Sequence, residues 1–339
     1  MGQIGLFDVE NRLSELSAMG DPLEKLDKAI NWKQFRPLID RAFRKERKSN
    51  AGRPPFDYVL MFKILVLQSM YNLSDEQTQF QILDRHTFKR FLGLRDEMVI
   101  PDQKTIWLFR ETLAKQDIVR KLFDLFDRYL NQAGFTAKKG QMVDATFVET
   151  PRQRNTREEN DAVKNGEIPD DWKDNPNKLR QKDLDARWTK KNDQTHYGYK
   201  NHLNVDVKNK IIRDYEVTSA EVHDSQPFND LFDPDNSGKG MWADSAYKSD
   251  EIDKNLRRKR IKNNINRKGY RNHPLTPFQQ MMNRKRSSIR ARIEHVNARL
   301  DCMIGRWIHC IGRLRAAAKI GLTNLIYNMT RYTYLKARA

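Results

Sequence analysis

The sequence predicts a mixed α+β protein in which a helical N-terminal domain, residues 1–135, precedes a mixed-sheet domain, residues 136–339. Three observations lead to this prediction. Apolar residues follow helical spacing in the first part of the chain and change to strand spacing at Gln141. Strand-like and helix-like segments then alternate after a polar insertion over about 150–195. A length of 339 residues is enough for two domains that each bury a core.

The N-terminal domain is predicted to consist of short helices joined by tight turns. Ser74 and Gln77 have the spacing of a capping box, in which each side chain bonds the other residue's backbone N–H. Pro101 and Asp102 mark the start of another helix. Such a series suggests a helix-turn-helix-like module. The predicted helices cover residues 60–67, 75–84, 102–109 and 118–130.

The second domain is predicted to begin with a strand in which Met142, Asp144 and Thr146 alternate with apolar neighbours. A turn over 208–210 joins two later strands into a hairpin. Apolar residues over 289–307 recur at steps of four and three, which predicts a long helix with one buried face. The other predicted elements are strands over 201–207, 211–217, 240–244 and 261–265, and helices over 225–232 and from about 249.

The charge of the chain indicates a polyanionic partner. The formal net charge is +18, and residues 254–339 hold 22 Lys and Arg against two acids, Glu294 and Asp301. A surplus of this size attracts polyanions from a distance, so nucleic acid is the expected partner.

Membrane and secreted classes are disfavoured. The longest apolar run, 58–71, is interrupted by Lys63 and Gln68 and is too short to cross a bilayer, and the N-terminus has no secretion signal. We therefore expect a cytoplasmic protein. Cys302 and Cys310 lack the paired spacing of zinc sites and disulfide frameworks, so we expect buried free thiols.

Three acids stand out as candidate metal ligands. Asp144 lies in the middle of a predicted strand, where an acid is disfavoured, and Asp244 ends another strand. Glu294 borders the apolar stripe of the long helix beside Ile293, although an ion pair with Arg290 four residues earlier would also explain it. Three converging carboxylates repel one another unless cations neutralise them. Two Mg²⁺ ions, with Mn²⁺ as a substitute, suit such an oxygen-only site and would support an in-line displacement at phosphorus.

Composition and spacing do not choose these three acids from 45, but a family resemblance does. Five segments resemble, in order and character, the catalytic domain of bacterial insertion-sequence DDE transposases. Upstream, Gly52–Pro55, Leu73–Asp75 and Arg90–Leu94 are similar to the helical N-terminal domain of the insertion-sequence-five family. The five segments are Val143–Thr146, His196–His202, Val222–Ser225, Ala243–Tyr247 and Arg290–Glu294.

The resemblance implies an RNase H-like catalytic domain in which the first and fourth strands are neighbours and a late helix brings Glu294 to Asp144 and Asp244. It also implies a helical DNA-binding or dimerisation domain at the N-terminus. One departure concerns the family signature of tyrosine, arginine, glutamate and lysine. Only Arg290 and Glu294 are kept, while Ser287 and Asp301 stand at the outer positions.

Several basic residues are candidate DNA contacts. Lys200 and His202 fall in a matching family segment, with a polar sheet edge as the equal alternative. Trp172 and Trp188 of the insertion are weaker candidates for stacking on bases, because such residues as often pack under their own loop. The remaining candidates are Arg286, Arg290, Arg292, Arg299, Arg257, Arg258, Lys259, Arg260, Arg44, Lys45, Arg53, Lys104 and Arg110.

The predicted function is that of a DDE transposase, which binds the terminal inverted repeats of an insertion sequence, cuts the DNA and joins it to target DNA. Because both ends must be held together, we expect a homodimer or larger assembly on double-stranded DNA in the bacterial nucleoid. Two alternatives stay open. One is an RNase H-like nuclease that cuts without joining, and the other is a DNA-binding repressor or domesticated transposase without catalysis.

Overall fold

The structure is a computed structural model that describes residues 7–44, 54–95, 97–191, 193–233, 236 and 240–338. The chain forms two compact units, Met1–Phe126 with Leu322–Ala339, and Asp127–Gly321. Residues 322–339 thus group with the helical unit, although the sequence division placed them with the second domain. No helix of the described ranges is long and apolar enough to cross a membrane.

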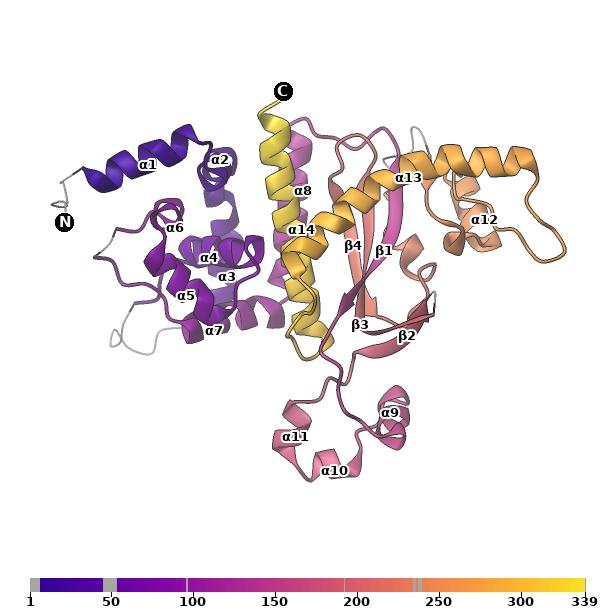
Figure 1. The fold of residues 1–339 in the computed structure, drawn as a ribbon, viewed down its shortest axis with the longest axis horizontal. Coiled ribbons are helices and arrows are strands. Elements are labelled where there is room, and N and C mark those ends of the chain that lie inside the picture. Colours follow the sequence, from indigo (N-terminus) through magenta and orange to yellow (C-terminus); the bar gives the residue numbers. More distant parts are fainter. Residues whose placement is uncertain are drawn as a thin grey trace. The chain divides into compact units, whose positions relative to one another are not determined.

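The helical unit contains short helices around α4, whose residues from Ile64 to Ser69 are all buried. Both predicted helix starts are confirmed. Ser74 and Gln77 form a capping box at α5, and Asp102 accepts a hydrogen bond from the Thr105 N–H at α7. The helices, labelled in Figure 1, are α1 (Asp8–Ala18), α2 (Pro22–Ala29), α3 (Arg36–Phe43), α4 (Tyr58–Met70), α5 (Asp75–Asp84), α6 (His86–Leu92), α7 (Gln103–Lys115) and the first part of α8 (Ile118–Gln132).

The second unit is built on a mixed sheet whose described strands run in the order β2-β3-β1-β5, and β4 also pairs with β3. β1 pairs with β3 and β3 with β4 in antiparallel fashion, whereas β5 is parallel to β1. A parallel bridge from Met241 to Asn263 continues the sheet beyond β5. β5 is the fourth strand predicted from the sequence, so its place beside β1 agrees with the strand order that the resemblance implied. The strands are β1 (Gln141–Glu149), β2 (Arg187–Lys191), β3 (Gln194–Asp206), β4 (Ile212–Ser219) and β5 (Met241–Trp242).

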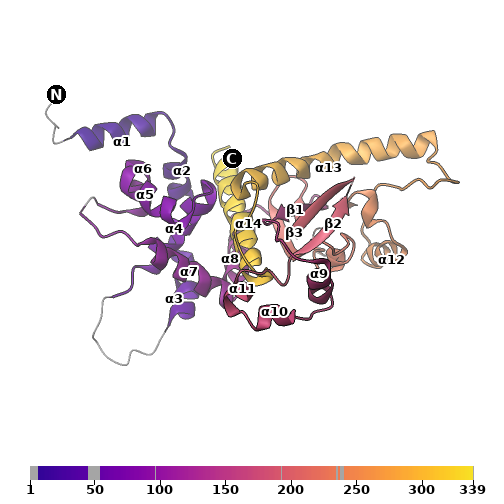
Figure 2. The same cartoon turned by 60° about the horizontal axis from the view of Figure 1, so that its bottom comes forward.

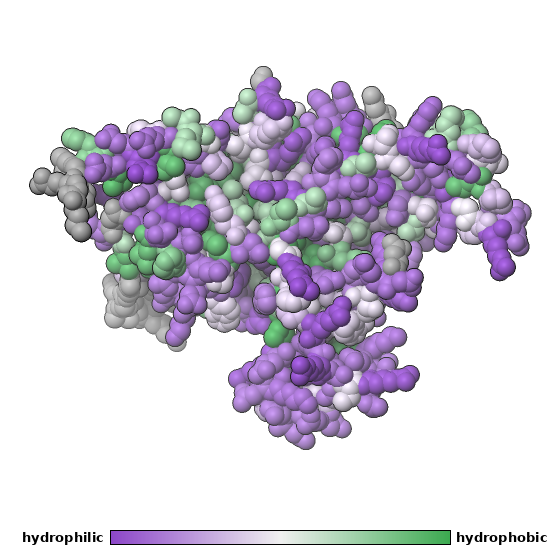
Figure 3. All heavy atoms as spheres, viewed as in Figure 1, coloured by the Kyte–Doolittle hydropathy of each residue, from purple (hydrophilic) through white to green (hydrophobic). Residues whose placement is uncertain are grey.

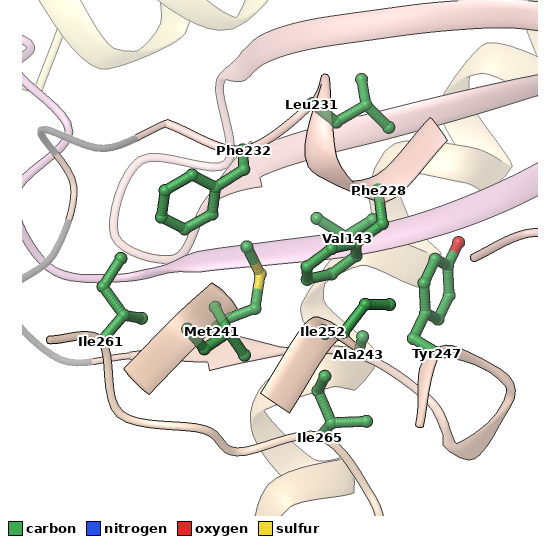
Figure 4. Packing of buried hydrophobic residues seen from close by; sticks show 11 residues of the cluster. Val143, Phe228, Leu231, Phe232, Met241, Ala243, Tyr247, Ile252, Ile261 and Ile265 are labelled. Carbon is green, nitrogen blue, oxygen red and sulfur yellow. The ribbon is translucent and has the colours of Figure 1, made fainter. Parts of the chain in front are cut away.

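Helices cover the sheet on both sides because successive strand residues point to opposite faces. On one face, Val143 joins an apolar cluster with Met241, Phe228 and Ile252 (Figure 4). On the other face, α13 (Pro277–Ile304) packs along β1 and β5, as Figure 2 shows. Ile293, Val296 and Leu300 are buried on this helix, so the predicted apolar stripe is confirmed.

Two predicted elements differ from the structure, and one helix of the structure was not predicted. The strand over 261–265 is reduced to the single bridge at Asn263, and the helix over 225–232 to a 3-10 turn, Pro227–Asn229. The predicted helix after Ser249 is present as α12 (Asp250–Arg258), with Ser249 as its N-cap. The helix α14 (Arg313–Lys336) was not predicted, because most side chains from Ala316 to Met329 are buried and leave no single apolar stripe.

Two predictions for the region around the end of α13 are wrong: the extent of the helix and the burial of the cysteines. α13 ends at Ile304, where Gly305 adopts a positive φ of 76°, so Trp307 lies outside the helix that was predicted to include it. Cys302 has a free thiol, as expected, and both it and Cys310 were expected to be buried. Their predicted burial is wrong, because Cys302 is exposed and Cys310 is half-buried.

The polar insertion forms a small helical layer with its own core. Trp172 is fully buried there, donates a hydrogen bond from Nε1 to Glu159 Oε1 at 2.7 Å, and has the Lys182 ammonium over its ring. Its predicted stacking on bases is therefore wrong. The surface of the insertion, the lowest lobe in Figure 3, is hydrophilic. Its helices are α9 (Arg157–Lys164), α10 (Asp170–Lys173) and α11 (Pro176–Arg180).

Candidate active site

Asp144 lies on β1, and Asp244 lies just beyond the end of the neighbouring strand β5. The parallel register pairs Met142 with Trp242, and its continuation by two residues places Asp244 beside Asp144 on the same face. Asp244 lies two residues beyond Trp242, the last residue of β5, and caps a 3-10 turn, Ser245–Tyr247, by accepting a hydrogen bond from the Ala246 N–H at 2.8 Å. The sheet topology therefore brings the first two predicted acids together.

The helix α13 supplies the neighbours of Asp144. Arg290 Nη1 lies 3.5 Å from Asp144 Oδ2, and Asn297 Nδ2 donates a hydrogen bond to the same oxygen at 3.3 Å. These two residues are seven positions apart, so they lie on one flank of the helix, two turns from each other. Only 15% of the Asp144 side chain is exposed.

Glu294 lies on the same flank but is turned outward. Its side chain is 60% exposed, and its Oε1 lies 3.2 Å from Arg290 Nη2. Within the described ranges no three Asp, Glu, His or Cys side chains are grouped as a metal site would require. The reason is electrostatic, because three carboxylates without cations repel one another and Arg290 offers Glu294 an alternative partner. The helical ion pair considered from the sequence is present.

The electrostatics of Asp144 suit a cation-binding oxygen. Burial is the main cause that raises the pKa of Asp144 to about 6, with the charge of Asp244 acting in the same direction and Arg290 in the opposite one. A nearby divalent cation would relieve the repulsion between the two carboxylates. The side-chain oxygen of Asn297 is buried and has no hydrogen-bond partner among the described residues, which adds a further oxygen ligand beside Asp144. The residues present therefore fit a hard divalent cation.

Lys200 and His202 are not brought to Asp144. The register of β1 and β3 sets Leu203 opposite Asp144, so Lys200 and His202, at odd spacing from Leu203, lie on the other face of the sheet. Lys200 Nζ donates to Asp224 Oδ1 at 2.8 Å, and His202 Nε2 lies 2.9 Å from Thr218 Oγ1. Burial lowers the pKa of His202 to about 4. Both side chains are buried and paired within the sheet.

Some of the other basic candidates are also engaged inside the protein. Arg286 donates to the backbone oxygen of Ile265 at 2.8 Å, and Arg292 to that of Val207 at 3.2 Å. Arg110 makes a two-point ion pair with Asp75. The exposed candidates are Arg44, Lys104, Arg257, Arg258, Lys259, Arg260, Arg292 and Arg299, whereas Lys45 and Arg53 lie outside the described residues.

Three neighbours of the site were not singled out from the sequence. Asn297 lies three residues after Glu294, so helical spacing alone could have indicated it. Lys191, on β2, lowers the pKa of Asp144 through its charge, and nothing in the polar insertion distinguishes it from other lysines. Tyr247 follows Asp244 by three residues and is fully buried.

Two neighbouring aspartates on or just beyond paired strands, beside a helix that carries a glutamate, can hold divalent cations and so suit chemistry at phosphodiester bonds. The comparisons assign the family. The model of the transposase DDE domain matches residues 136–329, which is more than half of the chain, and that of a transposase domain (DUF772) matches residues 11–112. The chain belongs to the transposase DDE family. It is an insertion-sequence type DDE transposase, an enzyme that cleaves DNA and transfers strands.

Among solved structures, the chain is similar to the piggyBac transposase in a cryo-EM structure of its synaptic complex with hairpin DNA. The TM-score is 0.49 at 14% identity, over 94% of this chain and 76% of that chain. DDE transposases bind DNA and use divalent metal ions, and both properties follow here from the family. The closer assignment to the insertion-sequence-five family stays a prediction.

Proposed function

We propose that Asp144, Asp244 and Glu294 hold two Mg²⁺ ions, for which Mn²⁺ can substitute, and that this site cuts the terminal inverted repeats of an insertion sequence and joins them to target DNA. The observation that carries the proposal is the placement of Asp144 beside Asp244, with the Glu294 helix packed along the same strands.

Glu294 can reach the aspartates without movement of the backbone. It lies between Arg290 and Asn297 on α13, and both of these residues contact Asp144. Because its side chain is long and exposed, rotation about its own bonds is enough to turn the carboxylate towards Asp144. This rotation breaks the ion pair between Glu294 and Arg290.

The residues have distinct parts in the reaction. The cations, when bound, neutralise the phosphate and activate the attacking oxygen. Asp144 and Asp244 fix the site through the rigid pairing of β1 and β5, and Asn297 keeps the Asp144 carboxylate in place. Water attacks the phosphodiester at the end of the element and releases a 3′-hydroxyl. That hydroxyl attacks target DNA in the same site, so a phosphodiester bond is broken and another formed without a covalent enzyme intermediate.

The exposed basic residues of each unit are the proposed DNA contacts. Arg257, Arg258 and Arg260 lie at the end of α12 and beyond, Arg299 on α13, and Lys104 on α7. Arg290 joins them once it leaves Glu294. Lys45 and Arg53 are kept as candidates from the sequence alone. A homodimer or larger synaptic assembly in the bacterial cytoplasm, associated with the nucleoid, completes the proposal.

Labelled inverted-repeat DNA and a target plasmid test this function. We expect cleavage and joining with Mg²⁺, and neither with EDTA or with Asp244→Ala. Joining that survives either condition contradicts the proposal. Cleavage without joining identifies a nuclease, and intact repeat binding without any cleavage identifies a repressor.

A further inference from the structure

The beginning of α13 and the loop before it form an arm that takes no part in the mechanism above. The arm covers residues 266–285, and its helical part extends past the strands in Figures 1 and 2. Asn283 fixes the loop on the helix, because its amide accepts a hydrogen bond from the Arg267 N–H at 3.0 Å and donates one to the Arg267 carbonyl at 2.9 Å. Asn266 Nδ2 donates a further hydrogen bond to Ser287 Oγ at 3.0 Å. The loop and the helix are therefore held together as one piece.

The arm carries positive charge that the protein does not neutralise. It contains five Lys and Arg and no Asp or Glu, and all five are exposed. None of the five makes an ion pair within the described part of the chain, whereas Lys173 of the insertion pairs with Asp170 and Lys178 with Glu159. Like charges without counter-charges repel one another, so their gathering indicates a polyanionic partner. The five are Arg267, Lys268, Arg271, Arg284 and Lys285.

The arm also exposes apolar side chains. Tyr270, Phe278 and Met281 are 63%, 67% and 43% exposed. Phe278, Met281 and Lys285 recur at steps of three and four on α13, so apolar and charged side chains share one face of the helix. Figure 3 shows hydrophobic residues among hydrophilic ones at the right-hand end, where Figure 1 places the start of α13. Phosphate contacts alone need no apolar groups, whereas a DNA groove offers surfaces to both kinds of side chain.

DNA fits this surface better than a second copy of the chain does. Two copies of the arm, placed face to face, would bring positive charges together without a single acid. The helix also determines where on the DNA the arm lies, since Phe278 stands 16 positions before Glu294 on α13. At a rise of about 1.5 Å per residue this is about 24 Å, the length of about seven base pairs.

We propose that the arm positions the DNA, with its five cations on phosphates and its apolar side chains in a groove, about seven base pairs from the phosphodiester at the candidate active site. This inference deepens the proposed function and rests on it for the place of the cleaved bond. Because the arm belongs to the helix that carries Glu294, DNA bound to it is held at a fixed distance from Asp144 and Asp244.

Titrations with repeat DNA in EDTA test the cations, because this binding needs no metal site. We expect Arg284→Gln with Lys285→Gln to lower the slope of log K against log salt concentration by up to about 1.8. DNA shortened in turn from either side of the element's terminal phosphodiester locates the contact. On one side the wild type should bind more tightly than this variant while more than about seven base pairs remain, and both should bind equally once the DNA ends clearly short of that length.

Arg157→Gln with Lys164→Gln is the matched control. It removes the same charge from exposed positions of α9, where Glu158 and Asp161 are neighbours, and should bind like the wild type to DNA of every length. If the arm variant also binds like the wild type, or differs from it equally on DNA of every length, the inference is overturned. These titrations do not depend on cleavage. A wild-type protein that binds through the arm but neither cuts nor joins the repeat contradicts the proposed function alone.

Phe278→Ser tests the apolar side chains. Because it removes no charge, it should weaken repeat binding about fivefold and leave the salt slope and the melting temperature unchanged. Phe80→Ser is its control, since Phe80 is similarly exposed, at 63%, but stands four residues from both Glu76 and Asp84 on α5. It should not change the affinity. Wild-type affinity in Phe278→Ser overturns the role of the apolar side chains. A dimer in sedimentation equilibrium without DNA that only Phe278→Ser dissociates assigns the surface to a second copy instead.

Discussion

The guanidinium of Arg290 lies against the carboxylate of Asp144, with 3.5 Å between Nη1 and Oδ2. Its other terminal nitrogen, Nη2, lies 3.2 Å from Glu294 Oε1. A single positive charge on α13 thus neutralises the two acids that the proposed function gives to cations. Arg290 and a divalent cation should therefore compete for the same oxygens.

Replacement of Arg290 by glutamine should strengthen cation binding while it weakens transposition. Loss of a partly exposed ion pair, worth about 1 kcal/mol, should raise Mn²⁺ affinity about fivefold. Calorimetric titration of the metal-free protein measures it. Arg284→Gln removes the same charge from an exposed position on α13 and should leave the affinity close to wild type. Equal affinities in both variants would show that Arg290 does not oppose the cation.

His202 should make stability depend on pH. Its folded pKa is about 4, against an ordinary value of 6.5, so between these values the unfolded chain takes up a proton that the folded protein does not. Stability is therefore lost as pH falls from 6.5 towards 4. The free energy of unfolding should drop by about 2 kcal/mol between pH 7 and pH 5 from this group.

Urea unfolding at both pH values checks the His202 prediction. His202→Asn should reduce the loss between pH 7 and pH 5 by that amount. Thr218→Val removes the hydroxyl partner of His202 but keeps the imidazole. It should lower stability at both pH values and retain the slope. An unchanged slope in His202→Asn would assign the pH dependence to other groups.

Several features of this fold could be predicted from the sequence because they depend on local chemistry. The capping box at Ser74 and the alternation around Asp144 are examples, since backbone hydrogen bonding and side-chain alternation act over a few residues. The prediction that Asp144 and Asp244 are neighbours came from the family resemblance, because no local pattern specifies which strands become neighbours.

The destinations of long basic side chains could not be predicted. Arg286 and Arg292 stand in a basic helix and resemble DNA contacts, yet each donates to a backbone carbonyl far away in the sequence. Whether a guanidinium contacts a carbonyl or solvent depends on tertiary packing, which cannot be predicted from sequence spacing. The outward orientation of the Glu294 side chain could not be predicted either, because it depends on the ion pair with Arg290.

Two residues of α7 that were predicted to contact DNA, Arg110 and Lys104, should have different roles: Arg110 in stability and Lys104 in DNA binding. Arg110 donates to both Asp75 oxygens, at 2.6 and 2.8 Å, and to Gln68 Oε1 at 2.7 Å, whereas Lys104 is exposed. Arg110→Ala should lower the free energy of unfolding by about 2 kcal/mol, as expected for a half-buried charged hydrogen-bond network. Lys104→Ala should leave stability unchanged and weaken DNA binding. Thermal unfolding measures the stability of both variants, and titration with repeat DNA measures their affinity. If Arg110→Ala weakens DNA binding without loss of stability, Arg110 contacts the DNA.

The exposed arginines at the end of α12 should appear in the salt dependence of DNA binding. Each phosphate contact contributes about 0.9 to the slope of log K against log salt concentration, so Arg257→Gln with Arg258→Gln should reduce the slope by up to about 1.8. Lys164→Gln with Lys173→Gln removes the same charge from the insertion and is the control. If both double variants lose the same slope, the effect comes from net charge. If only the α12 variant loses it, these two arginines contact the phosphates, because a general field would respond equally to either pair.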